Sequence, residues 1–96
     1  MPARIEVQNV GRPGKTYSVD AAKYADMRAA IETAVPTTPP GIAVADLIAA
    51  VKQHLSPTLF PGGATCGWWV KCVQLDLEAK GILARAPQPP VRLYRP

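Results

Sequence analysis

The chain has 96 residues, of which 48% are hydrophobic and 19% are charged, and its formal net charge is +4. A chain of this length buries only about 60–65% of its unfolded surface, so it forms one modest core and leaves little room for an enclosed active site. These values exclude multi-domain machinery and predict a single domain over residues 1–96.

The ends and the apolar stretches predict where the protein resides. Residues 1–10 include Arg4 and Glu6 and lack the apolar core of a signal peptide, so we expect a cytoplasmic protein. The longest apolar stretch, residues 42–51, is interrupted by Asp46 and is shorter than the about 20 residues that cross a membrane. We therefore expect no membrane segment.

The N-terminal third predicts a β-hairpin followed by a helix. Polar and apolar residues alternate on both sides of residues 11–14, which contain two glycines and a proline, and this pattern is typical of two strands joined by a turn. Asp20 is a suitable N-cap, and apolar residues then recur at helical spacing, which predicts a helix over residues 21–35. Residues 37–41 contain two prolines and predict a rigid connector.

The remaining two thirds predict two more helices and a second hairpin. Apolar residues at helical spacing from residue 44 predict a helix of about three turns that ends near Pro57. A third helix is predicted over residues 64–80, with Gly81 as its stop and Phe60 of the preceding loop anchored in the core. Short β-prone runs on either side of a proline-rich segment, at residues 82–86 and 91–95, predict a C-terminal hairpin.

This order of elements resembles a winged helix-turn-helix domain. The third helix carries Val70, Val73 and Leu77 and runs into residues 80–85, a passage similar to the recognition helix, glycine and first wing strand of bacterial winged-helix proteins. The resemblance covers about residues 21–95 and implies an α+β fold, with a three-helix core and a two-stranded wing over residues 20–96. Residues 1–19 are then an N-terminal hairpin extension.

The whole chain is also similar to a family of small bacterial proteins without an assigned function. The similarity rests on residues 13–17 and 60–71. This second resemblance adds little to the mechanism. The winged-helix resemblance implies a fold often used for binding DNA, and also used for contacts with RNA and protein.

The resemblance implies that the third helix and the wing contact nucleic acid. From residue 71 to residue 96, five basic residues face two acidic ones, so +3 of the net charge lies there. The alternative is an ordinary solvated basic edge. The expected nucleic-acid-binding residues are Thr65, Trp68, Lys71 and Gln74 on the helix and Arg85, Arg92 and Arg95 on the wing.

A second apolar stripe on the third helix supports a different function. It lies about 200° around the helix from the stripe that faces the other helices. Either the N-terminal hairpin covers this stripe or another chain does, including a second copy in a homodimer. We expect Trp69 in the core near Phe60 and Trp68 partly exposed. The stripe consists of Trp68, Cys72, Leu75 and Ala79.

The sequence offers little for catalysis. His54 is the only histidine, and no cluster of ligands has the spacing of a metal site. The glycine-rich residues 61–67 are followed by Trp68, where a phosphate-binding loop needs lysine. Cys66 and Cys72 are expected to be free thiols on covered stripes. We therefore expect a non-catalytic module without cofactor or metal, whose partner is DNA or another protein.

Overall fold

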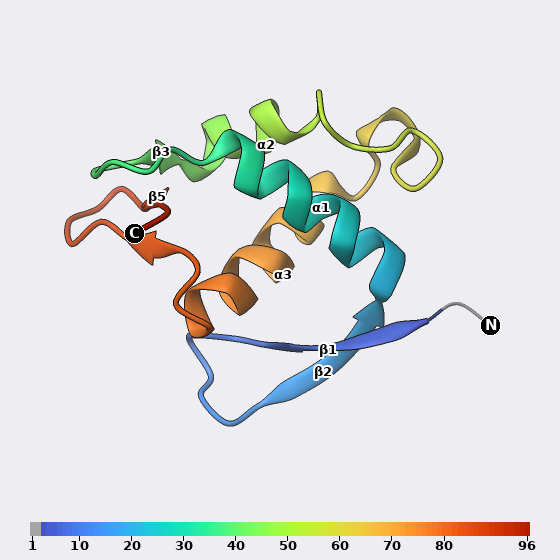
Figure 1. The fold of residues 1–96 in the computed structure, drawn as a ribbon, viewed down its shortest axis with the longest axis horizontal. Coiled ribbons are helices and arrows are strands. Elements are labelled where there is room, and N and C mark those ends of the chain that lie inside the picture. Colours follow the sequence, from blue (N-terminus) through green and yellow to red (C-terminus); the bar gives the residue numbers. More distant parts are fainter. Residues whose placement is uncertain (1–2) are drawn as a thin grey trace.

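The computed structural model describes residues 3–96, which form three α-helices and two small antiparallel sheets (Figure 1). This architecture confirms the mixed α+β class. The hairpin lies below α1 and α3 in Figure 1, and the second sheet lies beside α2. In chain order the elements are β1 (Arg4–Gln8), β2 (Thr16–Asp20), α1 (Ala21–Ala34), β3 (Ile42–Ala43), α2 (Val44–Val51), a 3-10 turn (Pro61–Gly63), α3 (Cys66–Ala79), β4 (Ala84–Arg85) and β5 (Arg92–Tyr94).

The N-terminal hairpin forms as the alternating pattern predicts. Strands β1 and β2 are antiparallel, with Val7 opposite Tyr17. Because successive side chains point to opposite faces, Val7 and Val19 share the inner face, and both are buried. Helix α1 begins directly after β2, and the Asp20 carboxylate accepts a hydrogen bond from the Lys23 backbone N–H at 2.9 Å. The expected N-cap is thereby confirmed.

Strand β3 was not predicted from the sequence. Its two residues, Ile42 and Ala43, pair with β5, and β5 also pairs with β4, so the strand order is β3-β5-β4. Two residues are too few to show an alternating pattern, and their partner strand lies at the other end of the chain. The preceding Gly41 has φ of 92°, and a Cβ there would lie 2.0 Å from the Leu93 carbonyl oxygen. Only glycine permits this close approach.

Two helices differ in extent from the predictions. Helix α2 ends at Val51 rather than near Pro57, and the chain then turns. The backbone N–H of Ser56 donates to the Asp26 carboxylate of α1 at 2.8 Å, which holds this turn against α1. Helix α3 begins two residues later than predicted, because Thr65 adopts a left-handed conformation with φ of 59°.

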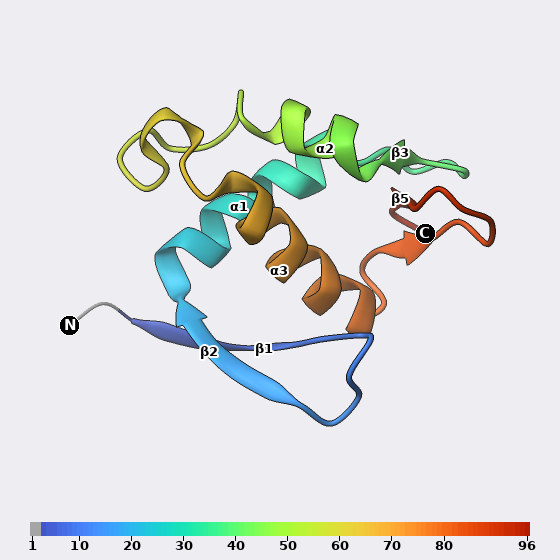
Figure 2. The same ribbon diagram turned by 180° about the vertical axis from the view of Figure 1, so that it is seen from behind.

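The core lies between the three helices, and the hairpin covers the C-terminal half of α3. In Figure 2, α3 lies in front of α1, and the hairpin passes beneath both. None of the helices formed by residues 3–96 has the length and apolarity needed to cross a bilayer. The larger core side chains are Tyr24, Met27, Ile31, Leu47, Phe60, Trp69, Leu77, Leu83 and Leu93.

One buried carboxylate joins the hairpin, α1 and α3. Asp76 of α3 is fully buried and accepts hydrogen bonds from the Gln8 backbone N–H at 2.8 Å, the Tyr24 hydroxyl and the Lys80 ammonium at 2.8 Å. Burial by itself would raise the pKa of Asp76, but these donors together hold the pKa below its ordinary value. Burial and the hydrogen bond to this carboxylate raise the pKa of Tyr24 to about 12.

Replacing Asp76 with asparagine is predicted to lower the free energy of unfolding by about 2–4 kcal/mol, because buried donors lose their charged acceptor. The pKa of Asp76 is lower in the folded than in the unfolded chain. The ionised Asp76 carboxylate therefore stabilises the folded chain fully when the pH is above its unfolded pKa of about 3.9. This stabilisation is lost as the pH falls through the lower pKa of the folded chain. Urea unfolding of wild type and Asp76→Asn between pH 7 and pH 2 should show a difference that narrows toward acid.

The control for this prediction is Asp46→Asn, which removes an exposed carboxylate from the first turn of α2. It should cost less than about 1 kcal/mol, because an exposed charge at a helix N-terminus contributes little. Equal losses for the two variants, or a difference for Asp76→Asn that does not change with pH, would contradict the structural role given to Asp76.

Candidate interaction surface on α3 and the N-terminal hairpin

The two adjacent tryptophans of α3 have different environments. Trp69 is 7% exposed and meets the Phe60 ring edge-on at a centroid distance of 6.1 Å. Trp68 is 55% exposed, and its ring lies 5.1 Å from that of Trp69 at an interplanar angle of 79°. Adjacent helical residues point about 100° apart, so only one of the two can enter the core. The predicted division of roles is confirmed.

Three of the predicted nucleic-acid-binding residues are exposed at the N-terminal half of α3. These are Thr65, Trp68 and Lys71. Within residues 3–96, no carboxylate forms an ion pair with Lys71. This half of α3 therefore presents a ring and an unpaired positive charge one helical turn apart.

Gln74 does not belong to this exposed set. Its side chain is fully buried, which corrects the prediction that it faces a nucleic-acid groove. It follows Val70 by four residues and precedes Leu77 by three, so its spacing places it on the stripe that faces the core. Its amide nitrogen donates to Glu78 at 3.1 Å, and its amide oxygen has no hydrogen-bond partner. The helical spacing could have revealed this burial, but the polar character of glutamine suggested a surface position.

The predicted basic residues of the wing are partly engaged within the protein. Arg85 forms a two-pronged ion pair with Glu78, at 2.9 Å through Nε and 3.0 Å through Nη2. The Nε of Arg95 lies 3.4 Å from the Val35 carbonyl oxygen. Arg92 is half-buried on β5. The wing therefore offers less available positive charge than the sequence suggests.

The N-terminal hairpin covers the middle of the second apolar stripe. Cys72 is buried, and the Tyr17 hydroxyl donates to its sulfur at 3.4 Å. The Val10 backbone N–H donates to the Leu75 carbonyl oxygen at 3.3 Å, and Leu75 is half-buried. Trp68 and Ala79, at the two ends of the stripe, remain exposed. Intramolecular cover thus accounts for part of the stripe, and the part around Trp68 is open to a partner.

A small hollow remains where the hairpin meets α3. We call it the aromatic hollow, and its volume is about 90 Å³. Tyr17 and Trp68 border it, and both rings are partly exposed, at 39% and 55%. The only other large hydrophobic residue exposed within residues 3–96 is Val10, which also lies beside α3. The aromatic hollow is lined by Tyr17, Trp68, Lys71, Cys72 and Leu75.

A second hollow, of about 210 Å³, lies between the hairpin tip and the C-terminal end of α3. Gly14 and Lys15 of the β1–β2 turn line this hollow together with Ala79 of α3. Arg12 is exposed on the same turn. The hairpin tip therefore carries two further cations, of which Lys15 lies beside the C-terminal end of α3.

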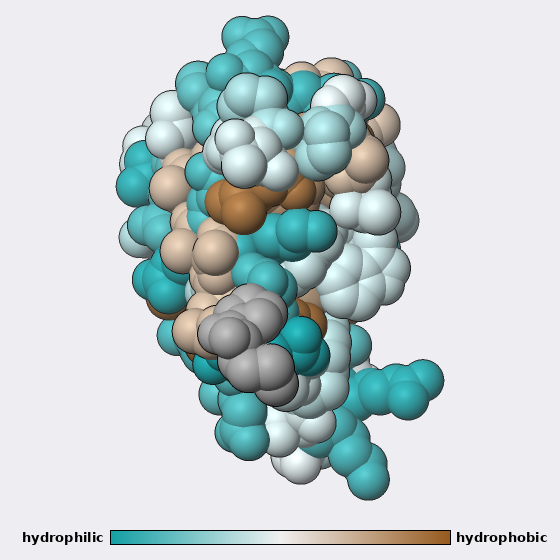
Figure 3. All heavy atoms as spheres, turned by 90° about the vertical axis from the view of Figure 1, so that its right-hand side faces the viewer, coloured by the Kyte–Doolittle hydropathy of each residue, from teal (hydrophilic) through white to brown (hydrophobic). Residues whose placement is uncertain are grey.

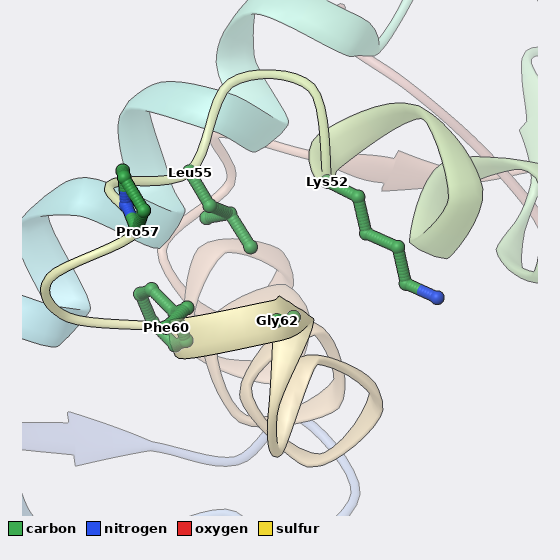
Figure 4. Close-up of a pocket in the computed structure, with 6 residues that line it drawn as sticks. Lys52, Leu55, Pro57, Phe60 and Gly62 are labelled. Atoms are coloured by element: carbon green, nitrogen blue, oxygen red, sulfur yellow. The ribbon is translucent and has the colours of Figure 1, made fainter.

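A third hollow, of about 280 Å³, lies on another part of the surface, between the end of α2 and the 3-10 turn. Figure 4 shows the Lys52 ammonium pointing away from Leu55 and Phe60. Its lining offers Lys52 as the one ionisable side chain, so it lacks the pair of groups that acid–base chemistry needs. Residues 3–96 contain no group of three or more His, Cys, Asp and Glu side chains that could hold a metal ion.

Figure 3 shows the side of the molecule that lies to the right in Figure 1. Hydrophobic residues appear there only as small separate areas among hydrophilic ones. Such scattered residues are normal on a protein surface and need no partner.

Both thiols are expected to be unreactive in the folded protein. Burial raises the pKa of Cys66, although Lys52 acts in the opposite direction. Burial also raises the pKa of Cys72, outweighing the hydrogen bond from Tyr17.

The thiolate is the reactive form of cysteine. An aromatic disulfide reagent at pH 8 should therefore label neither thiol of the folded protein within minutes, and should label both in 6 M guanidinium chloride. Rapid labelling of one thiol in the native protein would show that its covering segment opens; Cys66→Ala and Cys72→Ala variants identify which.

The sequence was also compared with known proteins. A family model described as "Family of unknown function (DUF6958)" matches residues 4–93. The match runs from β1 into β5, so it includes both the hairpin and the three helices. No curated protein and no solved structure matches the chain.

Proposed function

This chain belongs to the DUF6958 family, a family of unknown function, and we propose that it is a non-catalytic nucleic-acid-binding module of the winged-helix kind. The contact surface in this proposal is the exposed N-terminal half of α3, together with the hairpin tip and Arg92 of the wing. Trp68 and Lys71 lie on α3, Thr65 is its N-cap, and Arg92 lies on β5.

The connections of the fold support the winged-helix part of the proposal. Three helices pack together, and a two-stranded hairpin, β4 and β5, follows α3 as a wing does. Strand β3, between α1 and α2, extends this hairpin to three strands by pairing with β5. Because such a fold also serves other functions, the choice of nucleic acid has to rest on the surface.

The observation that carries the proposal is the pairing of an exposed ring with an unpaired cation on α3. Lys71 is exposed one turn beyond Trp68, and no carboxylate of residues 3–96 neutralises it. Arg12 and Lys15 add positive charge at the hairpin tip, where Lys15 lies beside the C-terminal end of α3. Cations of this kind attract phosphates and release counterions, and exposed rings stack on bases. The two carboxylates in the second half of α3 do not oppose this, because Asp76 is buried and Glu78 is paired with Arg85.

Binding to a labelled mixed-sequence DNA, followed by fluorescence anisotropy, should weaken as salt increases. The double variant Lys71→Ala/Arg92→Ala should bind more weakly. Each phosphate contact contributes a slope of about −0.7 to −0.9 to the plot of log affinity against log salt, so the slope should become less steep by up to about 2.

The matched control is Lys23→Ala/Arg28→Ala, which removes the same charge from α1. Helix α1 lies behind α3 in Figure 2. This control should retain most of the affinity and the original salt slope. Absence of binding at low salt, or equal losses in the two double variants, would contradict the proposal.

A second candidate function is self-association, favoured by one observation. Within the described residues, three large hydrophobic side chains are exposed, and all lie on or beside α3. They are Trp68 on the helix and Val10 and Tyr17 on the hairpin next to it. A tryptophan in such a setting is a typical anchor of a protein interface. Sedimentation at increasing protein concentration tests for a second copy on this surface, and Trp68→Ala should then shift the protein toward monomer.

A further inference from the structure

We infer that the nucleic acid recognised by this surface is single-stranded, and that an unpaired base stacks on Trp68 at the aromatic hollow while Lys71 meets a neighbouring phosphate. This inference rests on the proposed function and specifies its target. Three features of α3 and the hairpin lead to it.

The first feature is that α3 lacks side chains able to read a duplex. A helix in the major groove reads base edges mainly through arginine, lysine, asparagine and glutamine. In α3 only Lys71 and Gln74 belong to these types, and Gln74 is fully buried. One lysine remains, which can contact a phosphate but specifies little sequence.

The second feature is that the hairpin lies against the side of α3. Gln8 donates to Asp76 at 2.8 Å, Val10 donates to Leu75 at 3.3 Å, and the Tyr17 hydroxyl rests on Cys72. The second half of the helix is therefore flanked by two strands. A major groove about 12 Å wide admits one helix or one two-stranded ribbon, and a helix with a ribbon fixed to its side exceeds that width. A flexible single strand faces no such restriction.

The third feature is a ring platform that is already in place. Trp68 rests edge-on against Trp69, which is held in the core, and Tyr17 is held by its hydrogen bond to Cys72. Both rings line the hollow and are partly exposed, so a base can stack there without a side chain first being ordered. Preorganisation of this kind favours binding.

The composition of the hollow also predicts how selective the binding is. Cys72 and Leu75 form its apolar parts, and the Tyr17 hydroxyl is already engaged with sulfur. Lys71 is the one charged group that lines it. Stacking on a ring accepts every base, so binding should depend on unpaired bases and on salt, and little on sequence.

The test compares a labelled mixed-sequence 12-nucleotide single strand, as DNA and as RNA, with the duplex of the same sequence. We expect at least one single strand to bind about tenfold or more tightly than the duplex at the same salt. Trp68→Ala should weaken single-strand binding by about 5-fold to 100-fold, the range typical of base stacking, whereas Trp68→Phe should lose less. Gln53→Ala, which removes an exposed side chain beyond the end of α2 and outside the contact surface, is the control and should bind as wild type.

Intrinsic fluorescence provides a second readout that a merely structural role would not change. Unlabelled single strand should quench the emission of wild type, and Trp68→Phe should abolish the quenching, because Trp69 is buried. Unfolding curves of the variants establish that they are folded; Trp68 is more than half exposed, so its loss should leave stability nearly unchanged.

The failures of the two proposals are distinguishable. Duplex binding that equals or exceeds single-strand binding, with a salt slope that depends on Lys71, would overturn this inference and leave the proposed function standing. Single-strand binding without quenching, or unaffected by Trp68→Ala, would also overturn the inference. No binding to any of the nucleic acids at low salt would overturn both, and a dimer that is lost in Trp68→Ala would then assign the surface to a second copy of the chain.

Discussion

The carboxylate of Asp76 accepts hydrogen bonds from three separate parts of the chain, namely the backbone of β1, the hydroxyl of Tyr24 on α1 and the ammonium of Lys80 at the end of α3. A charge with no exposure to water is tolerable only when donors replace its hydration. One of those donors, the Gln8 backbone N–H, is in place only when the hairpin lies against α3. Full satisfaction of the buried charge therefore favours the docked position of the N-terminal extension, and the surface of α3 depends on that docking.

The docked hairpin divides the second apolar stripe of α3. The inner face of the hairpin buries Cys72 beneath Tyr17 and leaves Leu75 half-buried. Trp68 remains exposed. The four apolar side chains of the stripe are thus reduced to two exposed ones, Ala79 at one end and the Trp68 ring beside a lysine at the other, and the hairpin supplies a second ring next to Trp68. The candidate surface is therefore built by two segments far apart in the sequence. This joint origin suits it to a flexible strand better than to a rigid groove.

The positions of the exposed cations also favour a contact surface formed by α3 and the hairpin. The sequence places +3 of its net charge of +4 after residue 70, which predicts a wing contact with phosphate. In the folded chain Arg85 is held by Glu78, and Arg95 reaches toward the Val35 carbonyl oxygen. The cations left exposed around α3 are Lys71 and those of the hairpin tip, residues 12–15. Exposed cations without a partner are therefore found on α3 and the N-terminal hairpin more than on the C-terminal wing.

The sequence by itself determined the features that local spacing controls. The alternation of polar and apolar residues determined the N-terminal hairpin, and Asp20 determined where α1 begins. The angle of about 100° between adjacent helical residues determined that Trp69 is buried while Trp68 is exposed. Only the tertiary structure decided β3, the end of α2, the burial of Asp76, and the hydrogen-bond partners of Gln74 and Arg85. The β3 pairing and the docking of the hairpin on α3 depend on partners dozens of residues away. The Gln74 and Arg85 contacts depend on which helix face the packing covers. Periodicity along the chain records which residues share a face, but it does not record what covers that face.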